Sequence, residues 1–78
     1  MTENEFLAIF RELIQEDGDF NMDSSLTDLE SWDSMAIMAL IAWFDVEHHK
    51  SMTFETLQKL QTVEQIAALV PGFRHEPL

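Results

Sequence analysis

Apolar residues recur at helical spacing near the start of the chain. The i, i+3, i+4, i+7 pattern of a helix with one buried face is met by Phe6, Ile9, Phe10 and Leu13. Ahead of this stripe, Thr2 and Glu5 have the spacing of a capping box, which begins a helix. The residues Asp17-Gly18-Asp19 then interrupt the pattern. We therefore predict a first helix over about residues 3–16.

Residues 17–33 show no periodic pattern and are predicted to form one long loop. The apolar residues expected to anchor this loop to the core are Phe20, Leu26, Leu29 and Trp32. A connection longer than about 12–15 residues is uncommon in a compact domain and is often functional. The loop ends at Asp33, and either Asp33 or Ser34 can cap the helix that follows.

The second predicted helix, about residues 34–49, is apolar on two faces. Its predicted core face consists of Ile37, Leu40, Ile41, Phe44 and His48. The opposite face and its flanks, where a surface helix normally has charges, contain Met35, Met38, Ala39, Ala42, Asp45 and Val46. Either another element of the domain covers this second face or a partner protein does, since exposed surface rich in Met is typical of adaptable binding sites.

Two shorter helices are predicted in the last third of the chain. The first contains Phe54 and Leu57, and Leu60 follows it. A second capping box, Thr62 with Gln65, opens the last helix, which ends where Pro and Gly occur together. The predicted bounds are about 53–59 for the short helix, 62–70 for the last helix and 71–78 for the tail.

No segment shows the sustained alternation of apolar and polar residues that marks a strand. The sequence therefore predicts an all-α fold, a small four-helix bundle with three main helices, a short third helix and a long first loop. At 78 residues the chain has the length of one small domain, which we place over residues 1–78.

Composition and charge exclude several classes of protein. Fifteen Asp and Glu against four Lys and Arg give a net charge of −11, which repels nucleic acids. The longest uncharged run, residues 34–44, is much shorter than the roughly 20 residues of a membrane-spanning helix. The acidic N-terminus lacks the basic region of a signal peptide, so we expect a cytoplasmic protein. Because there is no cysteine, thiol chemistry requires a group added to the protein.

Two clusters contain metal-binding residue types, and both are weak candidates. Residues 17–28 place oxygen ligands at most positions of an EF-hand loop, but Met22 occupies the position that needs glycine. Asp45 and His49 are neighbours on one helix face, yet the adjacent His48 and His49 point about 100° apart and cannot chelate together. We therefore expect no metal site.

Ser34 lies where the acidic loop meets the uncharged helix. A nucleophilic serine needs a base and an orienting group, and this chain has neither a G-x-S-x-G motif nor a suitably spaced histidine. A hydrolase is therefore not expected. A plain helix cap is one interpretation of Ser34. The other is that its hydroxyl bears a phosphate group, because a helix N-terminus offers free backbone N–H groups and a positive dipole end.

Two segments, LTDLESWDSMAIMALIAWFDVE at residues 26–47 and LQKLQTVEQIAALV at residues 57–70, resemble the acyl carrier protein family. The hallmark of that family is Asp-Ser-Leu at the start of the second helix, where the serine bears a 4′-phosphopantetheine arm. Here the motif reads Asp33-Ser34-Met35. The spacing from Ser34 to Thr62, the length, the acidity and the helix order also match, and the resemblance covers nearly the whole chain.

The resemblance implies a non-catalytic carrier, expected to be a monomer. Ser34 would bear the covalent 4′-phosphopantetheine, flanked by Asp33, and the arm would present an acyl thioester to other enzymes. The implied partners are a phosphopantetheinyl transferase, an acyl- or aminoacyl-activating ligase, and an acyltransferase or synthase. Residues expected to contact partners are Met35, Met38, Ala39, Ala42, Asp45 and Val46. Residues expected to line an acyl pocket are Leu40, Phe44, Leu57 and Leu60.

Two departures distinguish the chain from the fatty-acid-synthesis members of the family. Those members usually have glycine where this chain has Ser31, and they have several Glu along the second helix, which here has no acid before Asp45. An apolar partner face favours dedicated partners in a specialised pathway. Asp-Ser-Met also occurs in D-alanyl carrier proteins, so an aminoacyl cargo stays open. A second alternative belongs to a different class of protein. It is an unmodified helical adaptor that binds a partner through the apolar face of the second helix.

Overall fold

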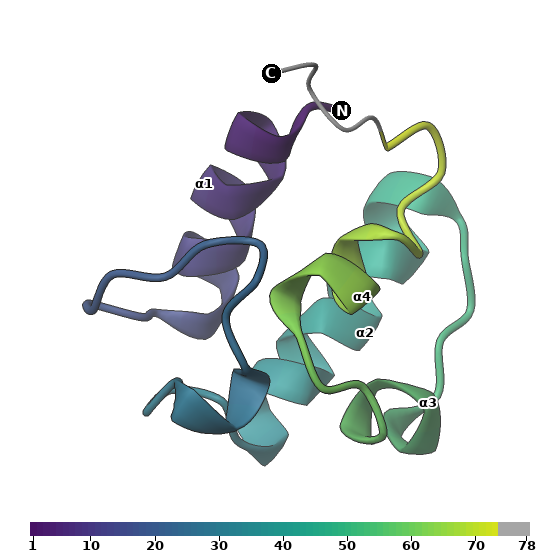
Figure 1. Ribbon diagram of the computed structural model, residues 1–78. Coiled ribbons are helices and arrows are strands. Elements are labelled where there is room, and N and C mark those ends of the chain that lie inside the picture. Colours follow the sequence, from purple (N-terminus) through teal and green to yellow (C-terminus); the bar gives the residue numbers. More distant parts are fainter. Residues whose placement is uncertain (74–78) are drawn as a thin grey trace.

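The computed structural model describes residues 1–73 and shows a bundle of helices (Figure 1). The elements are α1 (Glu3–Ile14), η1 (Leu26–Asp28, a 3₁₀ turn in the long loop), α2 (Ser34–His48), α3 (Phe54–Gln58) and α4 (Val63–Ala67). No strand occurs in this part of the chain, so the predicted all-α fold with four helices is confirmed. No helix within it is long and apolar enough to cross a lipid bilayer. Most of the predicted tail, residues 74–78, lies outside the described residues.

The first helix, α1, begins at the predicted capping box but ends earlier than residue 16. The Thr2 hydroxyl accepts a hydrogen bond from Glu5 N at 3.3 Å, and the Glu5 carboxylate accepts one from Thr2 N at 3.2 Å. At the other end Gln15 has a left-handed φ of 57°, which stops the helix at Ile14. The buried residues of α1 are Phe6, Phe10 and Ile14, whereas Ile9 and Leu13 of the predicted stripe are only half-buried.

Both α1 and α3 pack against α2. The Asp33 carboxylate caps α2 by accepting a hydrogen bond from Ala36 N at 2.9 Å. The helix ends at His48, one residue before the predicted end, because His49 has a left-handed φ of 51°. The buried residues of α2 are Ala36, Ile37, Leu40 and Phe44, while Ile41 and His48 of the predicted core face are half-buried.

The last helix, α4, is shorter than the predicted span of 62–70. Its capping box forms, but the helix ends at Ala67, and the last α-helical bond is the one that Ala68 N donates to Glu64 O at 2.9 Å. The N–H groups of Leu69 and Val70 then donate to carbonyls three residues back, at 3.0 Å each, so the chain tightens into turns. The predicted inner face is nevertheless buried: Val63, Ile66, Ala67 and Val70.

The long loop is attached to the start of α4. Leu26 N donates to Gln61 O at 2.7 Å, and Val63 N donates to Ser24 O at 3.1 Å. The Leu26 side chain is fully buried in the core. The middle of the loop is therefore fixed against the start of α4. This contact limits the positions that the residues between it and α2 can take.

Candidate functional site

Ser34 is the first residue of α2, and its side chain is exposed. No hydrogen bond joins its hydroxyl to another residue within the described part of the chain. Because Asp33 supplies the cap, the Ser34 hydroxyl is not needed for that role. The first N–H groups of an α-helix have no partner within the helix. An anionic group on Ser34 therefore meets backbone donors and the positive end of the helix dipole.

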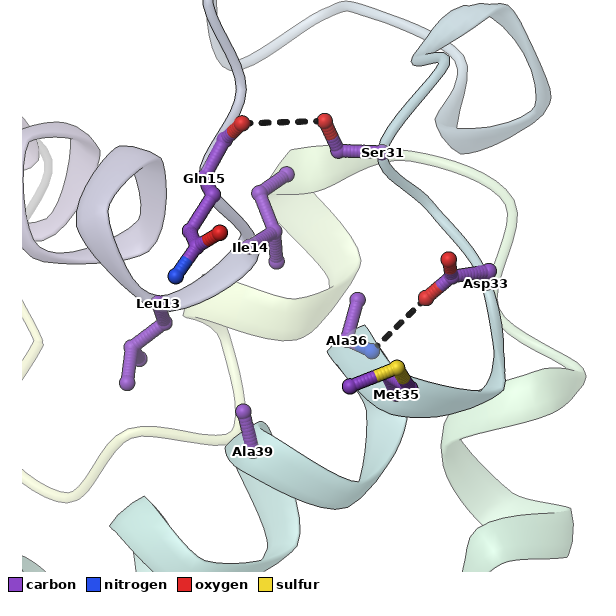
Figure 2. A pocket seen from close by; sticks show the side chains of 8 residues that line it. All are labelled: Leu13, Ile14, Gln15, Ser31, Asp33, Met35, Ala36 and Ala39. Atoms are coloured by element: carbon purple, nitrogen blue, oxygen red, sulfur yellow. Dashed lines mark hydrogen bonds between the residues drawn. The ribbon is translucent and has the colours of Figure 1, made fainter.

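A pocket of about 360 Å³ lies between the end of α1 and the start of α2 (Figure 2). We call it the α1–α2 pocket. Apolar and polar side chains line it together: Leu13, Ile14, Gln15, Ser31, Asp33, Met35, Ala36 and Ala39. Figure 2 shows the capping bond from Ala36 to Asp33 at its edge, and a bond from Ser31 to Gln15 that joins the loop to α1. The pocket therefore adjoins the residues on both sides of Ser34.

The loop segment before α2 is tied to the end of α1 by Glu16, which the structure buries. The Glu16 Oε2 accepts a hydrogen bond from Gly18 N at 3.0 Å, and its Oε1 accepts one from Ser31 N at 3.3 Å. The Ser31 hydroxyl donates to Gln15 O at 3.1 Å. We call this arrangement the Glu16 clamp. It joins two segments that are distant in sequence and so positions the residues that lead into α2.

The same contacts lower the pKa of Glu16 from its ordinary value of 4.5. The largest cause is the N–H group of Gly18, followed by the N–H group of Ser31. The Ser31 hydroxyl and the Arg11 charge act in the same direction, whereas burial opposes them. Arg11 also stabilises the Glu16 clamp, because its Nη1 donates a hydrogen bond to Gly18 O at 2.8 Å. The folded protein therefore favours the ionised carboxylate of Glu16.

We expect Glu16→Gln to have a lower melting temperature than the wild type at pH 7. This difference in melting temperature should disappear at pH 3. The stabilisation from a carboxylate with a lowered pKa is fully present above its unfolded-state value of 4.5 and is lost as pH falls through the folded-state value. Thermal unfolding of both proteins at pH 7 and pH 3 measures the difference. Glu12→Gln, at an exposed position of α1, makes the same charge change and should have little effect. Equal melting temperatures for Glu16→Gln and wild type at pH 7 would contradict the prediction.

The outer face of α2 is apolar and exposed. The exposed fractions of Met35, Met38 and Val46 are 80%, 60% and 68%. The other residues predicted to contact partners are Ala42 and Asp45, which are exposed, and Ala39, which is half-buried. The sequence left open whether another element of the domain covers this face. Within residues 1–73 none does.

A second pocket, of about 290 Å³, lies between α2 and the segment that leads into α3. We call it the α2–α3 groove. Its lining residues are Met38, Ile41, Ala42, Asp45, Ser51 and Met52. Two pockets therefore flank α2. The α1–α2 pocket lies at the start of the helix on the side of α1, and the α2–α3 groove lies beside its later residues on the side of α3.

The residues expected to line an acyl pocket belong mainly to the packed core. Leu40, Phe44 and Leu57 are fully buried, whereas Leu60 is half-buried and lines a pocket at the surface. An acyl chain can contact these three buried side chains only if the core around them opens. The acyl pocket therefore stays a prediction.

The residues weighed as metal ligands are not gathered around a common point. Within the described range, no group of three or more His, Cys, Asp and Glu side chains is arranged to hold an ion. The His48 ring instead packs against Trp43, with the ring centroids 4.8 Å apart, and its Nε2 is buried without a hydrogen-bond partner. Aromatic packing therefore accounts for the position of His48.

Sequence patterns did not reveal the Glu16 clamp. Glu16 is one of fifteen acidic residues, and nothing in its local pattern separates it from the others. Ser31 is notable in the sequence only because the fatty-acid-synthesis members of the related family usually have glycine at this position. Glu16 and Ser31 are fifteen positions apart in the sequence, and only the folded structure shows that they are in contact.

Comparison with known protein families matches residues 4–70 to the family described as phosphopantetheine attachment site. The match includes the Asp33-Ser34 junction and extends over all four helices. Comparisons with curated proteins and with solved structures gave no match. The resemblance to acyl carrier proteins is confirmed at the level of the family. The chain belongs to the phosphopantetheine-attachment family and is a carrier protein for a covalent 4′-phosphopantetheine arm.

Proposed function

We propose that Ser34 is the residue to which the 4′-phosphopantetheine arm is attached. The observation that supports this best is its exposed, unbonded hydroxyl on the first turn of α2, within the residues that match the family. The hydroxyl oxygen attacks the phosphate of the arm in its donor and gives up its proton to the transferase. A phosphodiester to Ser34 forms as the bond between this phosphate and the rest of the donor breaks, and the remainder of the donor leaves. The N–H groups at the start of α2 stabilise the charge of this phosphodiester, while Asp33 continues to cap the helix.

The arm supplies the thiol that this chain, with no cysteine, lacks. An acyl group joined to that thiol as a thioester is presented to other enzymes, so the chain acts as a non-catalytic carrier. The chain contributes the attachment point, the surface that partners bind and the packing that holds both in place.

We assign the outer face of α2 to partner enzymes. This partner surface consists of Met35, Met38, Ala39, Ala42, Asp45 and Val46. Its exposed apolar side chains favour partners that dock by hydrophobic contact rather than through basic patches. That preference supports a specialised biosynthetic pathway, with a phosphopantetheinyl transferase, an acyl- or aminoacyl-activating ligase and an acyltransferase or synthase as partners. The net charge of −11 attracts basic enzymes at long range before contact, whereas the docking contact itself rests on the apolar residues.

Intact mass spectrometry tests the proposed attachment. The purified chain is incubated with a phosphopantetheinyl transferase and the donor of the arm. We expect a mass gain equal to one arm, located at Ser34 by analysis of the modified peptide. No gain with several transferases, or a gain at another residue, would overturn the assignment.

The substitution Met38→Glu tests the partner surface. Met38 is 60% exposed, and a charge there removes an apolar contact and costs desolvation when a partner binds. We expect kcat/KM for arm transfer to Ser34 to fall about tenfold, the loss typical of an important interface residue. Gln58→Glu places the same charge at an exposed position of α3 and should have little effect. An unchanged kcat/KM for Met38→Glu would remove Met38 from the transferase surface.

The same variants test the adaptor alternative. A helical adaptor uses the apolar face of α2 but needs no arm. It predicts that Met38→Glu disrupts association with a partner or with a second copy, whereas Ser34→Ala has no effect on association. Modification at Ser34 together with loss of all carrier activity in Ser34→Ala would exclude it.

A further inference from the structure

Glu16 is a costly side chain for its place in the fold. Among residues 1–73 it is the only charged residue that is buried. It also lines a pocket of about 330 Å³, which we call the acidic pocket, together with four further carboxylates, those of Asp17, Asp19, Asp28 and Glu30. Burial and neighbouring like charges both disfavour an ionised carboxyl group. A charge in this position therefore indicates a role that a neutral side chain of the same size does not fill.

The bonds of the Glu16 clamp require two oxygen atoms. The N–H groups of Gly18 and Ser31 each donate to a different oxygen of the Glu16 carboxylate. Glutamine has the same shape but only one oxygen, and its amide nitrogen is itself a donor, so one of the two N–H groups would lose its acceptor. Gly18 leaves room for the contact, because a Cβ at that position would lie 3.2 Å from Glu16 Oε2. The carboxylate is therefore needed to hold both chain segments at once.

Side-chain packing contributes little to the contact that the clamp holds. Ser31 lines both the α1–α2 pocket and the acidic pocket. On α1 and just after it, Gln15 borders the first pocket and Glu16 the second. Close-packed side chains fix the distance between two segments, and here two pockets border the contact instead. The hydrogen bonds from Ser31 to Glu16 and to Gln15 O therefore set this distance.

The segment from Ser31 to Ser34 connects the clamp to the start of α2. Trp32 anchors this segment through its ring, while the clamp anchors the backbone at Ser31. Asp33 caps the helix through Ala36 N at 2.9 Å. Burial of α2 in the core begins at Ala36, so the exposed Ser34 depends on the cap and on the segment before it for its orientation. Release of Ser31 therefore loosens the position of the Ser34 hydroxyl.

The orientation of this hydroxyl matters more for the reaction than for binding. The Ser34 oxygen must approach the phosphorus atom of the donor in line, and a misplacement of about 1 Å can cost up to about a hundredfold in rate. The residues of the partner surface that lie further along α2, such as Met38 and Val46, are remote in sequence from the clamp. Loss of the clamp should therefore lower kcat for arm transfer and leave KM nearly unchanged.

We propose that Glu16 is a positioning residue for attachment of the arm. Through its bonds to Gly18 and Ser31 it holds the segment that leads into α2, and so it sets the orientation of the Ser34 hydroxyl. Ser31 assists through the bond from its own hydroxyl to Gln15 O. The proposal rests on attachment of the arm at Ser34, which is the proposed function. Glu16 acts through the chain and is not part of the partner surface.

Steady-state kinetics of arm transfer test this proposal. A transferase that modifies the wild type is used with saturating donor, each variant serves as the acceptor, and intact mass measures the modified chain. We expect Glu16→Gln to lower kcat by roughly three- to tenfold and to change KM by less than about twofold. Ser31→Gly keeps the N–H bond to Glu16 but removes the hydroxyl bond, so kcat should fall by roughly two- to threefold. The double variant should be little worse than Glu16→Gln alone, because both substitutions act on one contact.

Two control variants separate positioning from charge and from stability. Glu12→Gln removes the same charge at an exposed position of α1. Ile66→Val lowers stability by deleting part of a fully buried side chain in α4, outside the clamp. At a temperature at which every variant is folded, both controls should have the kcat and KM of the wild type.

The outcomes that would overturn the proposal are distinct. No transfer to Ser34 in the wild type overturns the proposed function itself. Transfer to the wild type with an unchanged kcat for Glu16→Gln, whatever its melting temperature, overturns the inference alone and leaves Glu16 a purely structural residue. An equal loss of kcat in Ile66→Val assigns the effect to stability and has the same consequence. If Glu16→Gln does not fold, Ser31→Gly decides, and an unchanged kcat in that variant overturns the inference.

Discussion

Ser34→Ala is expected to abolish attachment of the arm while leaving the fold intact. The substitution removes the hydroxyl oxygen that forms the phosphodiester, and no other group on the first turn of α2 can replace it. The helix itself does not depend on that hydroxyl, because Asp33 provides the cap through Ala36 N. Alanine is also the best helix former, so we expect stability to change by less than about 0.5 kcal/mol.

Mass spectrometry and thermal unfolding of the same samples measure the two halves of this prediction. The Ser34→Ala chain should show no mass gain with a transferase that modifies the wild type completely, and it should melt at nearly the same temperature. Thr27→Ala, which removes an exposed hydroxyl from η1, is the matched control and should be modified as the wild type is. A full mass gain in Ser34→Ala would show that the arm is attached elsewhere.

Phe10→Ala is expected to remove a large share of the protein's stability. The Phe10 side chain is fully buried, and its ring contacts Phe6, Phe20 and Trp32, with centroid separations of 5.6, 5.7 and 6.1 Å. Its loss removes apolar burial and leaves a cavity, at a cost of about 3–5 kcal/mol. A domain of this length has a total stability of roughly 4–12 kcal/mol, so this one substitution removes at least about a quarter of it.

This substitution also affects the site through Trp32, which precedes Ser34 by two residues and packs on the Phe10 ring. Urea unfolding followed by circular dichroism measures the free energy of unfolding, and we expect the midpoint to fall sharply or the native baseline to disappear. Val46→Ala deletes apolar atoms at an exposed position of α2 and should change stability by less than about 0.5 kcal/mol. A loss below about 1 kcal/mol for Phe10→Ala would show that α1 contributes little to the core.

The starts of the helices and the identity of the family could be predicted from the sequence. Thr2, Asp33 and Thr62 cap their helices through backbone N–H groups only three residues further on, so the signal is local. The periodic apolar residues fixed the number of helices in the same local way. The motif at Asp33-Ser34 and its spacing to the last helix were enough to identify a family that binds phosphopantetheine.

Tertiary structure alone decided where the helices end and which surfaces stay open. The Glu16 clamp at the end of α1 depends on a bond to Ser31, fifteen residues away, and the long loop depends on bonds to the start of α4. No pattern within one segment specifies such bonds, because each needs two segments placed side by side. The same holds for the pockets on either side of α2 and for its exposed outer face, since packing of α1 and α3 leaves them uncovered.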